Sequence, residues 1–276
     1  MRLFGVLSTC LLLCSASLAQ ADPASAPEAG AALAHRVGDV LDYTLTGNVA
    51  QAIVGRDAYG RKVDQAAMPT TLNGSEHVAI KDMTSLGISL YRSGQLVAVV
   101  SGGKPVKHPG SGWTLVRDDG TIARDNGNLG GVFLLPLVFL GENAVNDGAA
   151  LRVGDRWSAK LGTKLFGMTA RPTIRYAVDS QHLLLGVEVF SLSGEGSAPM
   201  KEPVYSNSGE PLGYATGTAR VTVRCDYDRV NKRIMSIELD ITDSLHLTSG
   251  KKTFGTVSDR QRYLVSLEPA TLSSKI

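Results

Sequence analysis

Apolar and polar residues alternate strictly along two long stretches in the last third of the chain. Residues 218–228 carry apolar side chains at every second position from Ala219 to Tyr227, and residues 233–247 resume the pattern from Met235 to Leu247. A period of two residues places one face on a core and the other in water, which predicts two long β-strands. Residues 229–231 between them predict a three-residue hairpin loop with Asn231 in the left-handed conformation.

The predicted hairpin defines faces and partners. Its register places Arg220 opposite Asp240 and Thr222 opposite Glu238 on the wet face. The opposite face, which we expect to be buried, includes Val221, Val223, Ile237 and Leu239.

Shorter alternating stretches predict further strands, and glycine, proline and serine mark the connections between them. We expect a turn at residues 92–94, a loop at 102–112 and a long loop at 194–213, which is a length typical of functional or disordered loops. The period slips between Val257 and Tyr263, which predicts a β-bulge there. Further strands are predicted at residues 40–45, 75–81, 86–92, 95–100, 113–117, 121–124, 157–161, 173–178, 183–191 and 254–267.

The alternation of apolar and polar residues predicts the fold class. Long alternating strands without helical periodicity predict a mainly β protein, with an antiparallel, strongly curved sheet or open barrel and one or two short helices packed on it. The tetrapeptide Arg-Val-Gly-Asp precedes a strand at residues 36–39 and again at 152–155, and residues 86–91 resemble 185–190. These echoes indicate two related halves, 36–145 and 146–276, of one β-rich domain. Chance recurrence of turn-plus-strand motifs is the alternative.

One segment breaks the alternation. Residues 129–141 carry no charge and are too short to span a bilayer. Pro136 suits the first turn of a short helix, which we expect at about 136–145, packed as a plug between the two halves. The alternative is a mobile lid over a ligand. The candidate ligand-binding residues lie in this segment: Val132, Phe133, Leu134, Leu137, Val138 and Phe139.

The amino-terminal residues predict export. Arg2, an apolar run over residues 3–13 and the small residues Ala19 and Ala21 predict a signal peptide over residues 1–21, and residues 22–35 form an Ala- and Pro-rich spacer. The expected location is therefore periplasmic or extracellular, without a lipid anchor and without a transmembrane segment. Cleavage leaves Cys225 as the single cysteine, which we expect to be a small buried hydrophobe.

Signatures of catalysis and cofactor binding are absent from the sequence. No dinucleotide fingerprint, phosphate loop, zinc-ligand spacing or nucleophile elbow occurs, so we expect no cofactor, no metal and no motif-encoded catalytic residue. A net charge of +2 without a basic run does not predict nucleic-acid binding. An acidic cluster of Asp226, Asp228, Glu238 and Asp240 is interleaved with arginines, which favours cross-strand ion pairs over a cation site.

Three functions remain, and no family signature is specific enough to name. The pattern resembles, in architecture alone, periplasmic lipid carriers in which a sheet curls over an apolar segment. The first hypothesis is a non-enzymatic binding protein of the bacterial cell envelope for a lipid or another apolar or amphipathic ligand. The second is a structural or protein-interaction module that meets an envelope protein through the loop 194–213 or a sheet edge. A hydrolase is the third.

Overall fold

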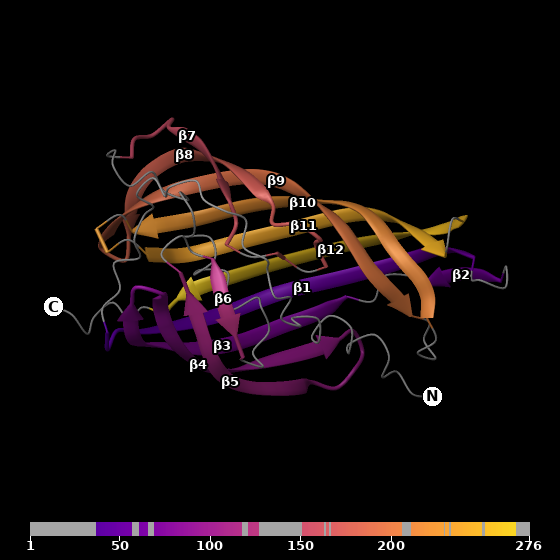
Figure 1. The fold of residues 1–276 in the computed structure, drawn as a ribbon, viewed down its shortest axis with the longest axis horizontal. Coiled ribbons are helices and arrows are strands. Elements are labelled where there is room, and N and C mark those ends of the chain that lie inside the picture. Colours follow the sequence, from indigo (N-terminus) through magenta and orange to yellow (C-terminus); the bar gives the residue numbers. More distant parts are fainter. Residues whose placement is uncertain are drawn as a thin grey trace.

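The computed structural model describes residues 37–56, 61–65, 69–117, 121–126, 151–162, 164, 165, 167–205, 211–228, 230, 231, 233–249 and 252–268. These residues form one large antiparallel sheet that is strongly curved and does not close into a barrel (Figure 1). They contain no helix, so the predicted all-β, open and curved fold is confirmed for the described part of the chain.

The strands follow the chain in a double meander. Their order across the sheet is β6-β5-β4-β3-β1-β12-β11-β10-β9-β8-β7, and β2 also pairs with β1. The amino-terminal strand β1 therefore lies beside the carboxyl-terminal strand β12 in the middle of the sheet. The bounds are β1 Val40–Arg56, β2 Lys62–Gln65, β3 Thr70–Thr84, β4 Gly87–Val100, β5 Val106–Val116, β6 Ile122–Asp125, β7 Arg156–Lys160, β8 Thr173–Leu184, β9 Val187–Tyr205, β10 Pro211–Asp228, β11 Arg233–Ser249 and β12 Lys252–Leu267.

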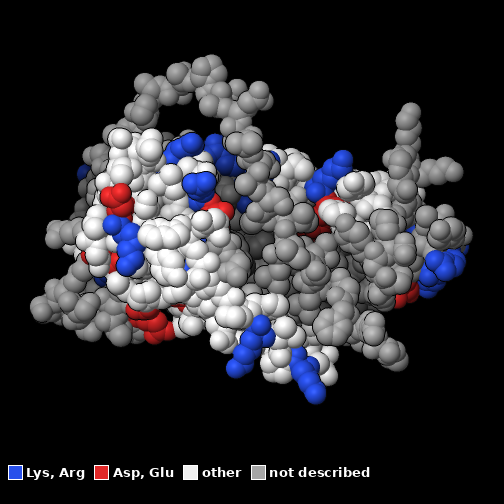
Figure 2. Space-filling view, turned by 60° about the horizontal axis from the view of Figure 1, so that its bottom comes forward, with Lys and Arg blue, Asp and Glu red and all other residues white. Residues whose placement is uncertain are grey.

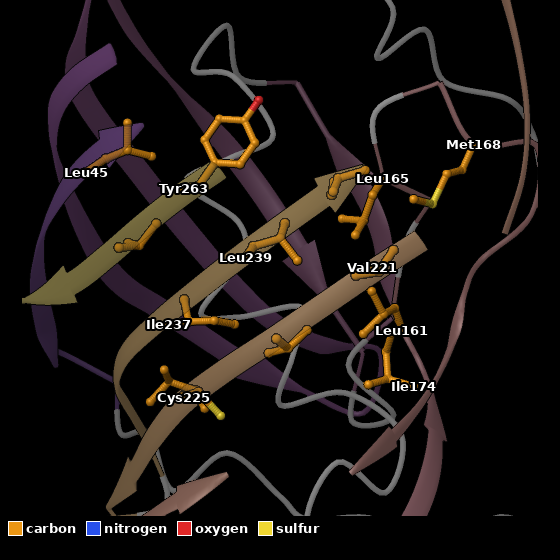
Figure 3. Packing of buried hydrophobic residues seen from close by; sticks show 14 of the residues in the cluster. Leu45, Leu161, Leu165, Met168, Ile174, Val221, Cys225, Ile237, Leu239 and Tyr263 are labelled. Atoms are coloured by element: carbon orange, nitrogen blue, oxygen red, sulfur yellow. The ribbon is translucent and has the colours of Figure 1, made fainter. Parts of the chain in front are cut away.

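The core covers one face of this sheet. Val221, Ile237 and Leu239 are fully buried and point to the same side as Tyr263 of β12 and Leu45 of β1 (Figure 3). The predicted inward face of the meander is therefore confirmed. The alternation works because each strand has only one apolar side, and the curvature turns all these sides toward a common interior.

The predicted hairpin loop is wrong in length and register. Four residues, 229–232, separate β10 from β11, and Arg220 lies opposite Thr242 instead of Asp240. A register shift between Asp226 and Tyr227 accompanies the longer loop. Asn231 does not adopt a positive φ; its backbone N–H instead donates to the buried Asp228 carboxylate over 3.0 Å. Because the error is two residues, the face assignment survives.

Glycine- and proline-rich stretches predicted as loops are strands. Residues 194–205 belong to β9 and 211–213 to β10, residues 92–94 lie inside β4, and residues 106–112 begin β5. Pro199 is tolerated because β8 stops pairing at Ser197, so no β8 ladder bond needs its missing N–H. Likewise, residues 183–191 are two strands joined by a turn at Leu185 and Gly186, and β2 is a short strand that the alternation did not predict.

Glycines inside the strands allow the sheet to bend. A Cβ atom at Gly94 would lie 2.2 Å from the carbonyl oxygen of Ser75 on β3. At Gly47 a Cβ would meet the ring of Tyr263 at 2.9 Å, since this tyrosine lies opposite it on β12. The missing side chains let neighbouring strands and an aromatic ring approach closely, which is how curved sheets are built.

The two sequence echoes adopt equivalent turns. Gly38 and Gly154 have φ values of 93° and 96°, and their N–H groups donate to Ile80 and Val178 on the neighbouring strands. In return, Ile80 and Val178 donate to the carbonyls of the aspartates that follow each glycine. The local likeness is real, while a duplication of the whole half-chain stays a prediction.

A segment between β7 and β8 packs on the inner face. Leu161, Leu165 and Met168 are buried, and Figure 3 shows them beside Val221 of β10. Met168 forms an isolated bridge with Met200 of β9. This segment was not foreseen as part of the core, because its apolar residues follow no strand period.

The two edges of the sheet come close without pairing. The edge strands β6 and β7 have four and five residues and share no hydrogen-bonded ladder. A hydrogen bond of 3.4 Å from Arg171 Nη1 to Thr121 Oγ1 joins the chain before β8 to the residue before β6. The sheet is therefore an open barrel with a gap between its edges.

Candidate ligand-binding face

The predicted ligand contacts lie outside the described residues. This holds for Val132, Phe133, Leu134, Leu137, Val138 and Phe139, for the helix expected at 136–145 and for the whole apolar segment 129–141. The candidate site is therefore built from the inner face of the sheet, where described side chains surround polar groups that sequence reasoning missed.

A carboxylate cluster interrupts the apolar inner face. Asp243 of β11 and Asp259 of β12 are directly opposite each other and are both buried. The N–H of Asp259 donates to Asp243 Oδ1 over 3.1 Å. Gln261 Nε2 donates to Asp259 Oδ2 over 2.5 Å, and Tyr263 O–H donates to Gln261 Oε1 over 2.9 Å. A chain of polar groups thus runs along the inner side of β12.

Glu202 of β9 completes this cluster from across β10. The β10 positions on the inner face between them are small, namely Ala215, Gly217 and Ala219. Burial, together with the nearby charges of Asp259 and Asp243, raises the pKa of Glu202 to about 7. The pKa of Asp243 is raised to about 7 by burial and by the charge of Asp259. Burial therefore favours the protonated forms of Glu202 and Asp243 up to about neutral pH, and it also raises the pKa of Asp259.

Each acid of the cluster keeps one oxygen without a hydrogen bond. Glu202 Oε1, Asp243 Oδ2 and Asp259 Oδ1 are buried and have no partner among the residues that the structure describes. Buried polar atoms are almost always paired in folded proteins, because an unpaired one loses its hydration without compensation.

The break in alternation that marks this cluster in the sequence was interpreted as a β-bulge. The slip of period between Val257 and Tyr263 predicted a bulge, but the β11–β12 pairing is regular there and its shift occurs between Leu247 and Thr248. The pattern broke because Asp259 and Gln261 occupy inward positions. Polar residues at the inward positions of a regular strand were the sequence feature from which this buried cluster could have been predicted.

A second polar network lies on the inner face of β3 to β6. Arg92 of β4 is fully buried and donates from Nε to Glu76 Oε1 over 2.6 Å. Its Nη1 donates to Thr114 over 3.2 Å and to Asp125 over 3.4 Å. Arg92 Nη2 and Glu76 Oε2 have no partner in the described part of the chain. Burial raises the pKa of Glu76 to about 7, although the charge of Arg92 acts in the opposite direction.

The raised pKa values predict that the protein loses stability as the pH rises. The folded state binds protons on Glu76, Glu202 and Asp243 more tightly than the unfolded state does, so their contribution is largest at acid pH. The stabilising contribution of these three groups decreases as the pH rises from about 4 to about 7. We expect the free energy of unfolding in urea to be about 2 kcal/mol lower at pH 8 than at pH 5.

Asp243→Asn should flatten this pH dependence, because it removes one of the buried protonation sites. Glu188→Gln, at an exposed carboxylate of β9 that accepts from Gln181, is the matched control and should leave it unchanged. A protein whose stability rises from pH 5 to pH 8 would contradict the assignment.

The acidic cluster predicted on the outer face forms ion pairs. Glu238 binds Arg262 through Nε over 2.6 Å, and Asp240 binds Arg260 over 2.9 Å. These two partners lie on β12, and Arg224 of β10, one of the interleaved arginines, also lies 3.9 Å from Glu238. Asp228 is not on the outer face: it is buried and bound to Arg233 over 3.2 Å. No group of three acidic, histidine or cysteine side chains in the described ranges has the arrangement of a metal site.

A serine, a histidine and an aspartate meet on β8, β9 and β10. Ser191 Oγ lies 3.5 Å from His182 Nδ1, and His182 Nε2 lies 4.0 Å from Asp226 Oδ1. The serine hydroxyl, however, donates directly to Asp226 over 2.8 Å. In a catalytic triad the histidine receives the serine proton, so this arrangement is not that of an activated nucleophile.

Cys225 is buried on the inner face, as predicted, and burial raises the pKa of its thiol. A thiol that stays protonated is a poor nucleophile.

Charged side chains of both signs are scattered in small groups over the face in Figure 2. Among the described residues, no helix combines the length and the apolar character needed to cross a membrane.

Comparison with known proteins adds little. No protein-family model and no curated protein matches the sequence. Among solved structures, the chain is similar to lipovitellin in a study of its lipid–protein interactions, with a TM-score of 0.44 and 9% sequence identity. The match covers 84% of this chain but only 25% of the lipovitellin chain. A likeness this weak carries no argument about function.

Proposed function

We propose that this chain is an exported, non-enzymatic binding protein of the cell envelope that holds an amphipathic ligand against the inner face of its open sheet. One observation carries the proposal: an apolar inner face contains buried carboxyl oxygens of Glu202, Asp243 and Asp259 without hydrogen-bond partners in the described residues. Ligand sites typically combine an apolar lining with a few convergent polar groups.

The chemistry of the cluster indicates the polar end of the ligand. The orphan oxygens Asp243 Oδ2 and Asp259 Oδ1 accept hydrogen bonds, and no Lys or Arg that the structure describes forms an ion pair with either carboxylate. A ligand with a hydroxyl or amine end would supply the missing donor, whereas a carboxylate end would add repulsion. The small residues Ala215, Gly217 and Ala219 leave this part of the β10 face without large side chains.

The openness of the sheet supports the same proposal. Because β6 and β7 share no ladder among the described residues, a ligand would enter between them without breaking backbone pairing of these two strands. A closed barrel would have to unpair two strands to admit a bulky ligand, at the cost of several backbone hydrogen bonds.

The proposal is tested by titrating the mature protein with N-phenyl-1-naphthylamine, whose fluorescence rises in apolar surroundings, and by displacing it with compounds of equal chain length. We expect dodecylamine and dodecanol to displace the probe at concentrations about tenfold lower than dodecanoate, because the carboxylates repel an anionic end. Asp243→Asn combined with Asp259→Asn should reduce that preference. Asp240→Asn on the outer face is the matched control.

Native mass spectrometry of protein purified from its own envelope completes the test. A copurified lipid-like molecule supports the proposal. Absence of both probe uptake and copurified ligand would contradict it. A stoichiometric protein partner would instead favour the interaction module, although one of its predicted surfaces, the loop 194–213, is mostly strand.

A further inference from the structure

Exposed aliphatic side chains gather at one end of the sheet. We call this end the turn rim; it contains residues 37–39, 83–86, 153–155, 183–186 and 230–231, at the left end of Figure 1. The pairings place these turns together, since β1 begins where β3 ends and β8 ends where β10 ends. Its most exposed aliphatic residues are Val37 (60%), Leu86 (72%), Val153 (57%), Leu183 (74%), Leu185 (61%) and Val230 (73%).

Aliphatic residues are unusual at these positions. Turns favour Gly, Asn, Asp, Ser and Pro, each of which suits the backbone conformation or bonds to it. Leu185 even adopts a positive φ of 52°, a conformation that costs energy for a side chain branched like leucine. An exposed apolar side chain in a strained turn buries little surface within the chain, so contact with an apolar surface outside it would stabilise this position.

Both sequence echoes lead to this rim. Val37 and Val153 are the second residues of the two Arg-Val-Gly-Asp turns, and Leu86 and Leu185 precede Gly87 and Gly186 at the tips of the β3–β4 and β8–β9 hairpins. Each half of the chain therefore exposes one aliphatic residue at each of these two equivalent turns. Equivalent exposure at equivalent turns makes accidental placement a poor explanation.

The chemistry of the rim fits a lipid surface better than a protein. All six side chains are aliphatic, whereas the anchor residues of protein interfaces are mainly Trp, Tyr and Arg. They stand on separate turns along a curved end and do not form one flat patch, so a protein partner would need several separate pockets. A fluid bilayer interface admits isolated aliphatic side chains at any spacing. Within the rim the charged residues are Asp39 and Asp155, which are half-buried, and exposed charges of both signs flank it among the described residues, namely Lys81, Asp82, Arg152, Arg156 and Glu188.

We propose that the turn rim docks the protein onto a lipid bilayer by inserting these aliphatic side chains into the interface. The inference goes beyond the proposed function and does not need a ligand inside the sheet. Because the described charges that flank the rim are of both signs and form no basic patch, binding should not depend on anionic lipids or fall steeply with salt.

The test is flotation of the full mature protein with phosphatidylcholine vesicles. We expect the parent protein to float at low and high salt. Leu86→Asp combined with Leu185→Asp should lower its partition coefficient by at least about tenfold, because each leucine contributes burial energy and each aspartate must be dehydrated. Leu264→Asp, at an equally aliphatic and 43% exposed position on the outer face of β12, is the matched control and should float like the parent.

A second variant keeps the test independent of folding. In Leu185→Trp the added fluorescence should shift to the blue when vesicles are mixed in, since the indole enters the interface. No flotation of the parent, or an equal loss in Leu264→Asp, would overturn the proposal. So would flotation that needs anionic lipid and disappears in salt. Uptake of the naphthylamine probe is measured separately, so failure of one proposal leaves the other standing.

Discussion

Replacing Arg92 by Met should lower the free energy of unfolding by about 3–5 kcal/mol at pH 8, which is the usual cost of breaking a buried ion pair from one side. The guanidinium is fully buried and bonds to Glu76, Thr114 and Asp125, which belong to three other strands. Without it, two carboxyl groups and a hydroxyl lose a charged donor in a site without water access. The urea midpoint of the mature protein measures this loss.

A double variant separates charge from packing. Glu76→Gln in the Arg92→Met background removes the uncompensated carboxylate, so it should recover part of the lost stability. The loss should also be smaller at pH 5, because Glu76, with a pKa of about 7, is then protonated. If Arg92→Met cost less than about 1 kcal/mol at pH 8, the network would not be the structural tie between β3 and β6 that its geometry indicates.

Leu239→Ala should cost about 2–5 kcal/mol, because it removes a fully buried side chain from the centre of β11 and leaves a cavity. The neighbouring residue Glu238 points to the outer face, where it pairs with Arg262 and Arg224 on the partly exposed surface. Glu238→Ala should therefore cost less than about 1 kcal/mol.

This pair of variants tests the face assignment directly, since the two residues are adjacent in the chain and differ only in the side to which they point. Denaturant midpoints of the two single variants are compared with the parent. The opposite ranking would show that the inner and outer faces of β11 have been exchanged.

Sequence reasoning reached the fold class because the strands of the carboxyl-terminal half alternate cleanly. Val221 and Ile237 are where the period places them, and the period depends only on the β pleat. Loop prediction failed where glycine and proline lie inside strands. Gly194 and Gly196 of β9 leave room for Ile174 and for the backbone of Thr173, a tertiary requirement that no local pattern carries.

The candidate site was predicted less well than the fold. Asp243 occupies an inward position of the period from Met235 to Leu247, but the close approach of Asp259 follows only from the register of β11 on β12. Glu202 approaches them across an intervening strand because the sheet is curved. Arg92 was placed in a turn, since Ser93 and Gly94 follow it, and the structure instead buries it in the middle of β4.

The ladder between β1 and β12 joins residues from the two ends of the chain: Thr44 Oγ1 donates to the carbonyl of Ser266, 222 positions away. The middle of the sheet therefore cannot form until nearly the whole chain has left the ribosome, and a topology this non-local folds slowly. Until β12 arrives, β1 and β11 are both open edges that can pair with another copy of the chain. A chain that folds this late is exposed to such pairing for a long time, and the export that its amino-terminal residues predict would benefit from the same delay, because a secretion channel passes an unfolded chain.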